Sequence, residues 1–391
     1  MTPQAHAEAA ARLERLRGFV AADPKNPALV AESAELALQL GLARDAHQWI
    51  EVALAATPGD PRLLASFASA KLGMGELQAA VDLLGPLVES NPDSVPLRYN
   101  YGYALLRVGQ YEQAKEALAR IVDRAEAPAN TRHLLLSALH YLGELDEAIG
   151  HGLKIAELNP GDVMAAGMLS LIYADAGNWA EAKRWSKTVL QDQPDNLEGL
   201  LAAGTVALTE EDDEDARAKF DKALERGPAN ERAWAGRGAA AMLKFNLPEA
   251  RSNFERAVQA MPQNVQLRNA LAWCQMLEKD YAGAKATLES ALAIDRTVGD
   301  THGNLAVLAV FEGRREEAEH LAKRARGLDP MSFGATLADT LLLQAAGRPE
   351  AARQLFEANF RAAAWPGGGT AADVLLRTAR RKHQHGYPRP R

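Results

Sequence analysis

Several residue types that dominate other protein classes are scarce in this chain of 391 residues. It contains a single cysteine, which excludes a disulfide framework and a cysteine-based zinc site. Aromatic residues make up only 6% of the chain, and Val, Ile and Thr are sparse. Because strands favour β-branched and aromatic side chains, a β-sandwich, a barrel or a Rossmann-type sheet is not expected.

Long apolar runs and an excess of basic charge are also missing. The longest apolar run, Leu305 to Phe311, is far shorter than the ~18 residues of a membrane-spanning helix. The N-terminal stretch mixes arginines with leucines, so it lacks the apolar segment of a signal peptide. The net charge is −7, which gives no overall basic signature for nucleic acid. We therefore expect a cytoplasmic protein with no membrane span and no nucleic-acid partner.

Helix-forming residues are abundant. Roughly a fifth of the residues are Ala, and Leu is also plentiful. These two residues lead the helix-propensity scale. With 47% hydrophobic and 24% charged residues, the chain has the composition of a folded protein. The composition therefore predicts an all-α fold.

A period of 34 residues runs through the chain. Prolines recur at multiples of this step, and at the two positions of this series that lack proline the residues are Glu126 and Arg296. A second series, or ladder, with the same step has Ala at all ten of its positions. A third has Gly, which is replaced in three units by Glu211, Phe245 and Lys279. Such self-similarity is typical of a repeat architecture. The prolines and alanines of the two ladders are Pro24, Pro58, Pro92, Pro160, Pro194, Pro228, Pro262 and Pro330, and Ala46, Ala80, Ala114, Ala148, Ala182, Ala216, Ala250, Ala284, Ala318 and Ala352.

One unit shows how the spacing produces structure. Trp234 and Gly238 share one face of a first helix, and Ala250 and Phe254 share one face of a second. The small residues allow the two helices to approach closely, and the aromatic rings fill the space around them. Pro262 ends the second helix. One such hairpin cannot bury its faces alone, so neighbouring hairpins must stack.

This pattern resembles the tetratricopeptide repeat, a helix–turn–helix unit of 34 residues. The resemblance covers residues 27–364 as ten repeats and implies an all-α, right-handed α-solenoid with capping helices at both ends. Residues 1–24 are expected to form an N-terminal capping half-repeat. Residues 365–391 are expected to hold a short capping helix, at 370–382, and a basic disordered tail. Gly152 and Ser186 depart from the large residue usual at position 24, so we expect looser helix pairing in those two repeats.

Motifs of enzymes are missing from the sequence. It has no phosphate-binding loop followed by Lys-Ser/Thr, no His-Glu-x-x-His and no Gly-x-Ser-x-Gly. Cys274 occupies a slot that holds Ala in other repeats, which favours a small core residue over a reactive thiol. The run of acids from Glu210 to Asp215 is interpreted as a solvated turn, with a site for a cation or basic partner as the alternative. We expect no enzyme activity, no cofactor and no metal.

The resemblance also implies a concave groove lined by one stripe of each first helix. In this sequence the stripe is rich in aromatic, His and Met residues, which are common contact residues. The alternative concerns repeat position 12, where Leu106, Leu208, Met242 and Met276 would pack between neighbouring first helices instead. His133 and His140 lie on one helix face, but no acid or cysteine joins them at helical spacing to make a metal site. The candidate groove residues are Tyr99, Tyr103, His133, His140, Met164, Leu171, Asn269, Trp273, Asn304 and Val307.

Charge is distributed unevenly. Residues 361–391 hold seven Lys and Arg against one acid, which gives this tail a net charge of +6. Because the whole chain carries −7, the rest of the chain carries −13. The tail is interpreted as a solubilising end, or alternatively as a hook for an acidic partner, the acidic body or a membrane surface.

The function predicted from these features is a non-enzymatic scaffold that binds a peptide or helix of a partner protein in the groove and assists assembly of a larger complex. One alternative is a regulatory or substrate-recruiting subunit of an enzyme, such as a glycosyltransferase or a polysaccharide or pilus assembly system. The other is a helical-repeat RNA binder, which the acidic body disfavours.

Overall fold

The computed structural model describes residues 3–362, and every element of secondary structure in that range is an α-helix. The all-α fold class is therefore confirmed. Helices of 13 or 14 residues alternate along most of the chain, as a 34-residue helix–turn–helix period requires. The predicted C-terminal helix at 370–382 and the tail lie outside the described residues.

The chain divides into two compact units, residues 1–165 and 166–391. The first unit contains α1 (Pro3–Ala22), α2 (Pro27–Gln39), α3 (Ala43–Ala56), α4 (Pro61–Gly73), α5 (Leu77–Ser90), α6 (Val95–Arg107), α7 (Tyr111–Ala119), α8 (Thr131–Leu142) and α9 (Leu145–Leu158). Helix α10 (Val163–Asp175) contains the division.

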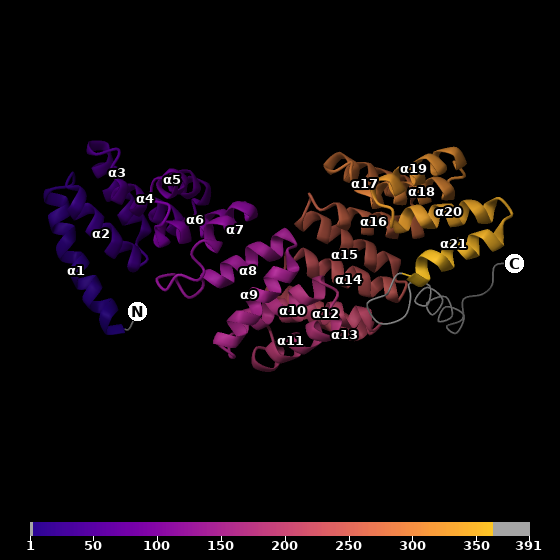
Figure 1. Ribbon diagram of the computed structural model, residues 1–391, viewed down its shortest axis with the longest axis horizontal. Coiled ribbons are helices and arrows are strands. Elements are labelled where there is room, and N and C mark those ends of the chain that lie inside the picture. Colours follow the sequence, from indigo (N-terminus) through magenta and orange to yellow (C-terminus); the bar gives the residue numbers. More distant parts are fainter. Residues whose placement is uncertain (1–2, 363–391) are drawn as a thin grey trace. The chain divides into compact units, whose positions relative to one another are not determined.

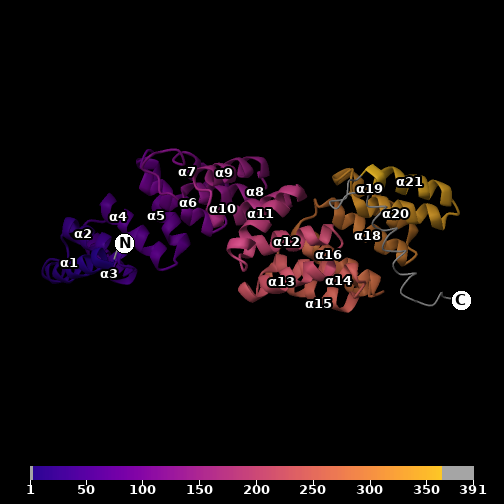
Figure 2. The ribbon, with the colours of Figure 1, turned by 90° about the horizontal axis from the view of Figure 1, so that it is seen from below.

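The second unit continues with α11 (Trp179–Asp192), α12 (Leu197–Thr209), α13 (Asp213–Arg226), α14 (Glu231–Leu243), α15 (Leu247–Ala260), α16 (Val265–Leu277), α17 (Tyr281–Ile294), α18 (Gly299–Phe311), α19 (Arg315–Leu328), α20 (Phe333–Ala345) and α21 (Pro349–Ala362). Within each unit, helices that follow one another in the sequence pack side by side (Figures 1 and 2). The even-numbered helices are the first helices of the repeats, and several of them also contact the next even-numbered helix.

Capping side chains fix where many of these helices begin. The residue before the helix accepts a hydrogen bond from a backbone N–H of the first turn, which satisfies a donor that has no partner within the helix. The residues that cap in this way are Asn26, Asp60, Asn178, Asn196, Asp212, Asn230, Asn246, Asn264, Asp280 and Ser332.

The turns inside the hairpins require a left-handed backbone. Seven of them use glycine at this position, with φ between +70° and +83°. Glu211, Phe245 and Lys279 take the same conformation, with φ of 58°, 59° and 67°. Side chains with a Cβ rarely adopt this region. The third sequence ladder therefore marks a backbone conformation, and three repeats adopt it without glycine.

The alanine ladder lies in the core. Nine of its ten side chains have no exposed surface, and Ala352 is 5% exposed. The predicted close approach of paired helices is also present, because a Cβ added to Gly238 would lie 2.8 Å from the ring of Phe254. Residues of this kind must stay small for the helices to pack.

Helix α1 covers the first full repeat. It packs against α2, and its buried side chains are Leu13 and Val20. Phe19 on the same helix is 61% exposed.

Candidate functional site

Two neighbouring first helices of the first unit carry four of the candidate groove residues. Tyr99 and Tyr103 lie on α6, and His133 and His140 lie on α8, which packs beside α6. All four side chains are partly exposed. We call these four residues the α6–α8 surface.

Hydrogen bonds hold the two tyrosines of this surface in place. The hydroxyl of Tyr99 donates to the Oδ1 of Asn130 at 2.9 Å. The Nη1 of Arg107 donates to the hydroxyl of Tyr103 at 2.9 Å, and its guanidinium carbon lies 5.7 Å from the ring centroid. The rings are therefore fixed before any ligand arrives, which reduces the entropy lost on binding.

His133 is paired with an acid that sequence spacing did not reveal. Its Nε2 lies 3.1 Å from both carboxylate oxygens of Asp162, and the two side chains are 14% and 16% exposed. Burial alone would raise the pKa of Asp162, but hydrogen bonds from the Ala165 N–H and from His133 outweigh it and lower the pKa below its ordinary value. Asp162 thus joins α8 to the start of α10.

Met164 extends the exposed apolar area of the first unit. It lies in the first turn of α10 and is 61% exposed, and Leu158 at the end of α9 is 69% exposed. Met side chains adapt to partners of different shape.

Four candidate groove residues of the second unit are buried. Leu171 is 9% exposed, Asn269 is 5%, Asn304 is 3% and Val307 is fully buried. Asn269 donates from Nδ2 to the hydroxyl of Thr301 at 3.1 Å. The burial of these four side chains differs from the expectation that they line a groove, and it leaves them almost no surface for a ligand.

The close approach of α18 and α20 explains the burial of Val307. A Cβ added to Gly303 would lie 2.7 Å from the backbone nitrogen of Ala335, and one added to Gly334 would lie 2.6 Å from the carbonyl carbon of Gly303. Two glycines thus let the backbones touch, which closes the space that the stripe would otherwise line. Val307 belongs to the same apolar cluster as Ala335 and Ala338 of α20.

Trp273 is the candidate of the second unit that keeps exposed surface. Its ring lies edge-on to Phe333 with centroids 6.0 Å apart. Phe333 is 40% exposed, and nearby in sequence Met331 is 71% exposed. An exposed aromatic pair of this kind is a common contact element.

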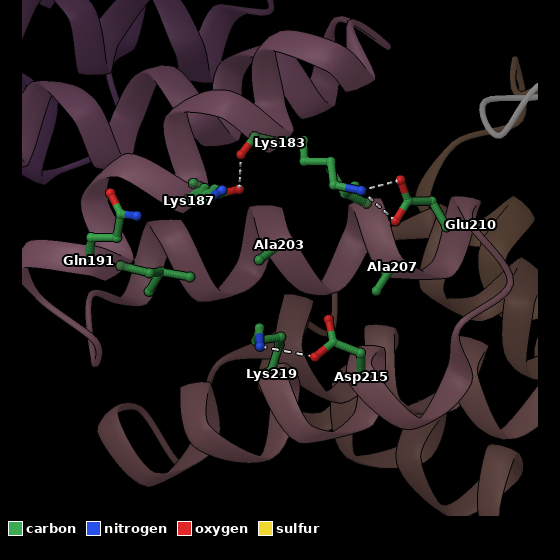
Figure 3. Close-up of a pocket in the computed structure, with 11 residues that line it drawn as sticks. Lys183, Lys187, Gln191, Ala203, Ala207, Glu210, Asp215 and Lys219 are labelled. Atoms are coloured by element: carbon green, nitrogen blue, oxygen red, sulfur yellow. Dashed lines mark hydrogen bonds and ion pairs between the residues drawn. The ribbon is translucent and has the colours of Figure 1, made fainter.

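A hollow of about 360 Å³ lies among α11, α12 and α13 (Figure 3). The Nζ of Lys183 lies 2.6 and 3.0 Å from the carboxylate oxygens of Glu210, and that of Lys219 lies 3.0 Å from Asp215. Sequence reasoning missed the hollow, although Ser186 was the signal. Where most other repeats place a large apolar side chain at position 24, such as Phe220, this repeat has a small one.

Catalytic and metal-binding groups do not converge in the part of the chain that the structure describes. No three His, Cys, Asp or Glu residues are grouped to hold a metal there. Burial raises the pKa of the Cys274 thiol to about 12, so the thiolate needed for nucleophilic chemistry is not formed near neutral pH. Of the 210–215 run, Asp212 caps α13 and the next three acids form its first turn, where Asp213 and Glu214 pair with Lys244.

Family models described as tetratricopeptide repeat match residues 71–136, 168–231, 241–297 and 275–335, together more than half of the chain. The chain belongs to the tetratricopeptide repeat family. No curated protein matches the sequence.

Solved structures share the tetratricopeptide repeat fold at low identity. The APC/C hetero-tetramer Cut9-Hcn1 is 14% identical with a TM-score of 0.54, and the match covers 90% of this chain and 83% of that chain. The human IFIT1 dimer with m7Gppp-AAAA is 14% identical with a TM-score of 0.53, covering 92% and 95%. Identities this low show the fold alone.

Membership in the tetratricopeptide repeat family indicates a protein–protein interaction scaffold in general, and proteins of this family are generally non-enzymatic. Among the helices of residues 3–362, none combines the length and the apolar character needed to cross a membrane.

Proposed function

We propose that this protein is a non-enzymatic scaffold whose α6–α8 surface holds a peptide or helix of a partner protein and brings that partner into a larger complex. The observation that carries the proposal is the set of Tyr99, Tyr103, His133 and His140 on two adjacent first helices, all partly exposed.

The chemistry of these side chains suits a protein ligand. Tyrosine buries a large apolar ring while its hydroxyl keeps a polar contact, and it is enriched among the residues that dominate binding energy. Asn130 and Arg107 already hold the two tyrosine hydroxyls. The buried Leu171, Asn269, Asn304 and Val307 have no part in this surface. Trp273 with Phe333 is a second contact point, on the other unit.

Photo-crosslinking in cells tests the proposal directly. A benzophenone amino acid in place of Tyr103 is expected to crosslink a partner peptide that mass spectrometry can sequence. The matched control places it at Phe19, an aromatic residue that is 61% exposed on α1 of the same unit. Equal crosslinking from both positions, or none from position 103, would contradict the proposal.

Substitution provides the second arm. Replacing both Tyr99 and Tyr103 by Ala is expected to weaken capture of the crosslinked partner by at least about tenfold, because contact residues of this type each contribute about 1 kcal/mol or more. Tyr141, which is 64% exposed at the end of α8, supplies the control Tyr141→Ala. Crosslinked RNA in place of a peptide would favour the nucleic-acid alternative.

A further inference from the structure

Repeat position 4 of several first helices makes the same hydrogen bond. The Nε1 of Trp234 donates to the backbone carbonyl of Pro228 at 2.9 Å, and a guanidinium nitrogen of Arg268 donates to that of Pro262 at 2.5 Å. In α18 the residue at this position is His302, whose Nε2 lies 3.0 Å from the carbonyl oxygen of Arg296. Because a carbonyl only accepts, the proton of the imidazole must be on Nε2.

The other nitrogen of His302 is buried without a partner. The side chain is 3% exposed, and Nδ1 has no hydrogen-bond partner among the described residues. Buried polar atoms are nearly always hydrogen-bonded, so an unpaired one indicates a missing ligand or water. His302 borders a hollow of about 300 Å³ lined by Glu289, Leu292, Ala293, Arg296, His302 and Arg324, from α17, the turn after it, α18 and α19 (these helices are labelled in Figure 1).

Two arginines of this hollow have unused donors. Within residues 3–362, the guanidinium groups of Arg296 and Arg324 make no hydrogen bond or ion pair. Arg296 occupies a slot of the proline ladder, and no backbone bond from its own N–H is present. The turn therefore does not require arginine at this position.

The equivalent hollow of an earlier repeat shows what is different here. Its corresponding residues are Pro228, Trp234 and Arg256, and the guanidinium of Arg256 stacks on the indole with its carbon 4.6 Å from the ring centroid. The ring uses that arginine through a cation–π contact. With His302 and Arg296 in place of Trp and Pro, the later hollow has a second guanidinium and no indole to cover either one.

We propose that the hollow beside His302 binds the phosphoryl group of a phosphate monoester. The planar fork of each guanidinium matches two oxygens of such a group. A phosphoryl group offers three terminal oxygens, enough for both arginines and for His302, whereas a carboxylate offers two. Nδ1 joins by accepting a hydrogen bond from the hydroxyl of a singly protonated phosphoryl group. Glu289, 3.9 Å from Lys285, adds one negative charge at the rim and disfavours polyphosphates.

Calorimetric titration of the full chain tests this site. The probes are inorganic phosphate, a phosphoserine peptide, the same peptide without phosphate, and sodium acetate, all at one ionic strength. Phosphate and the phosphoserine peptide are expected to bind with one site per chain. A free phosphate that binds as tightly as the phosphopeptide identifies a small-molecule site, and a tighter phosphopeptide identifies a modified side chain of a partner protein.

Three variants locate the binding. Arg296→Pro restores the proline ladder and is expected to weaken phosphate binding by at least about tenfold while the protein melts no earlier. Arg324→Gln is expected to have a similar effect and does not involve the turn. Arg256→Ala, in the equivalent hollow, is expected to leave binding unchanged. The proposal is overturned if wild-type protein fails to bind phosphate, if acetate binds as tightly, or if Arg296→Pro and Arg324→Gln bind like wild type.

Discussion

Single side chains couple elements of this protein that are far apart in the sequence, and Asp162 is a clear case. Its carboxylate accepts a hydrogen bond from the N–H of Ala165 at the start of α10 and contacts His133 on α8. These bonds favour the charged form, so the pKa of Asp162 is lowered in the folded protein. The stability it supplies is present above the unfolded pKa of about 3.9 and is lost as pH falls through the lower, folded pKa.

The variant Asp162→Asn tests this dependence, since Asn keeps the capping oxygen and removes the charge. We expect it to lower the free energy of unfolding of the first unit by about 1 kcal/mol at pH 7. The difference from wild type should shrink at pH values below about 3.9, where the carboxylates of both states become protonated. Urea unfolding at several pH values measures it. A difference that is constant with pH would contradict the role of the charge.

The left-handed turns supply a second prediction at this scale. Lys279 adopts φ +67°, a conformation that costs a residue with a Cβ about 1 kcal/mol. Lys279→Gly is therefore expected to raise the melting temperature, with a gain of roughly 0.5–1 kcal/mol. The reverse change at an equivalent turn, Gly313→Lys, is the control and is expected to lower it. A lower melting temperature for Lys279→Gly would show that its side chain stabilises the turn.

At the scale of helices, the contact between α18 and α20 differs from what the repeat pattern suggests. The period predicts the helices, their pairing and the buried alanine ladder, because those features depend on residues within one unit. Burial of Val307 depends on how closely two first helices approach, and that distance is set jointly by Gly303 and Gly334. Equal spacing along the first helices therefore identified the partly exposed Tyr99, but it could not predict that Val307 is buried between α18 and α20.

The variant Gly303→Ala measures the importance of this contact. The added methyl group would lie 2.7 Å from both the backbone nitrogen of Ala335 and the Oγ of Ser332. We expect a loss of about 1–3 kcal/mol in the free energy of unfolding, as for other overpacked sites. Gly327→Ala in α19 is the matched control, because its Cβ meets nothing within 4 Å and Ala favours helix. An unchanged urea midpoint for Gly303→Ala would refute the tight contact.

At the scale of the whole molecule, stability is distributed along the array of repeats. Each helix packs mainly against its neighbours in sequence, and the apolar clusters are local. The sequence period predicts this organisation because it depends on residues within one repeat and its neighbours, as the hairpin does. It does not predict the partner of His133 or the hollow beside His302, because those depend on single residues that depart from the ladders.

Hydrogen exchange with mass spectrometry tests how far a local change spreads through such an array. In the Gly303→Ala protein, amides of α16 to α20 are expected to exchange faster than in wild type, because each repeat is stabilised by its nearest neighbours. Amides of α2 to α8, in the first unit, are expected to keep their wild-type rates. Gly327→Ala should accelerate neither region. Equally faster exchange in both units would instead mean that the whole chain unfolds cooperatively, so that the contact between Gly303 and Gly334 affects the stability of every repeat.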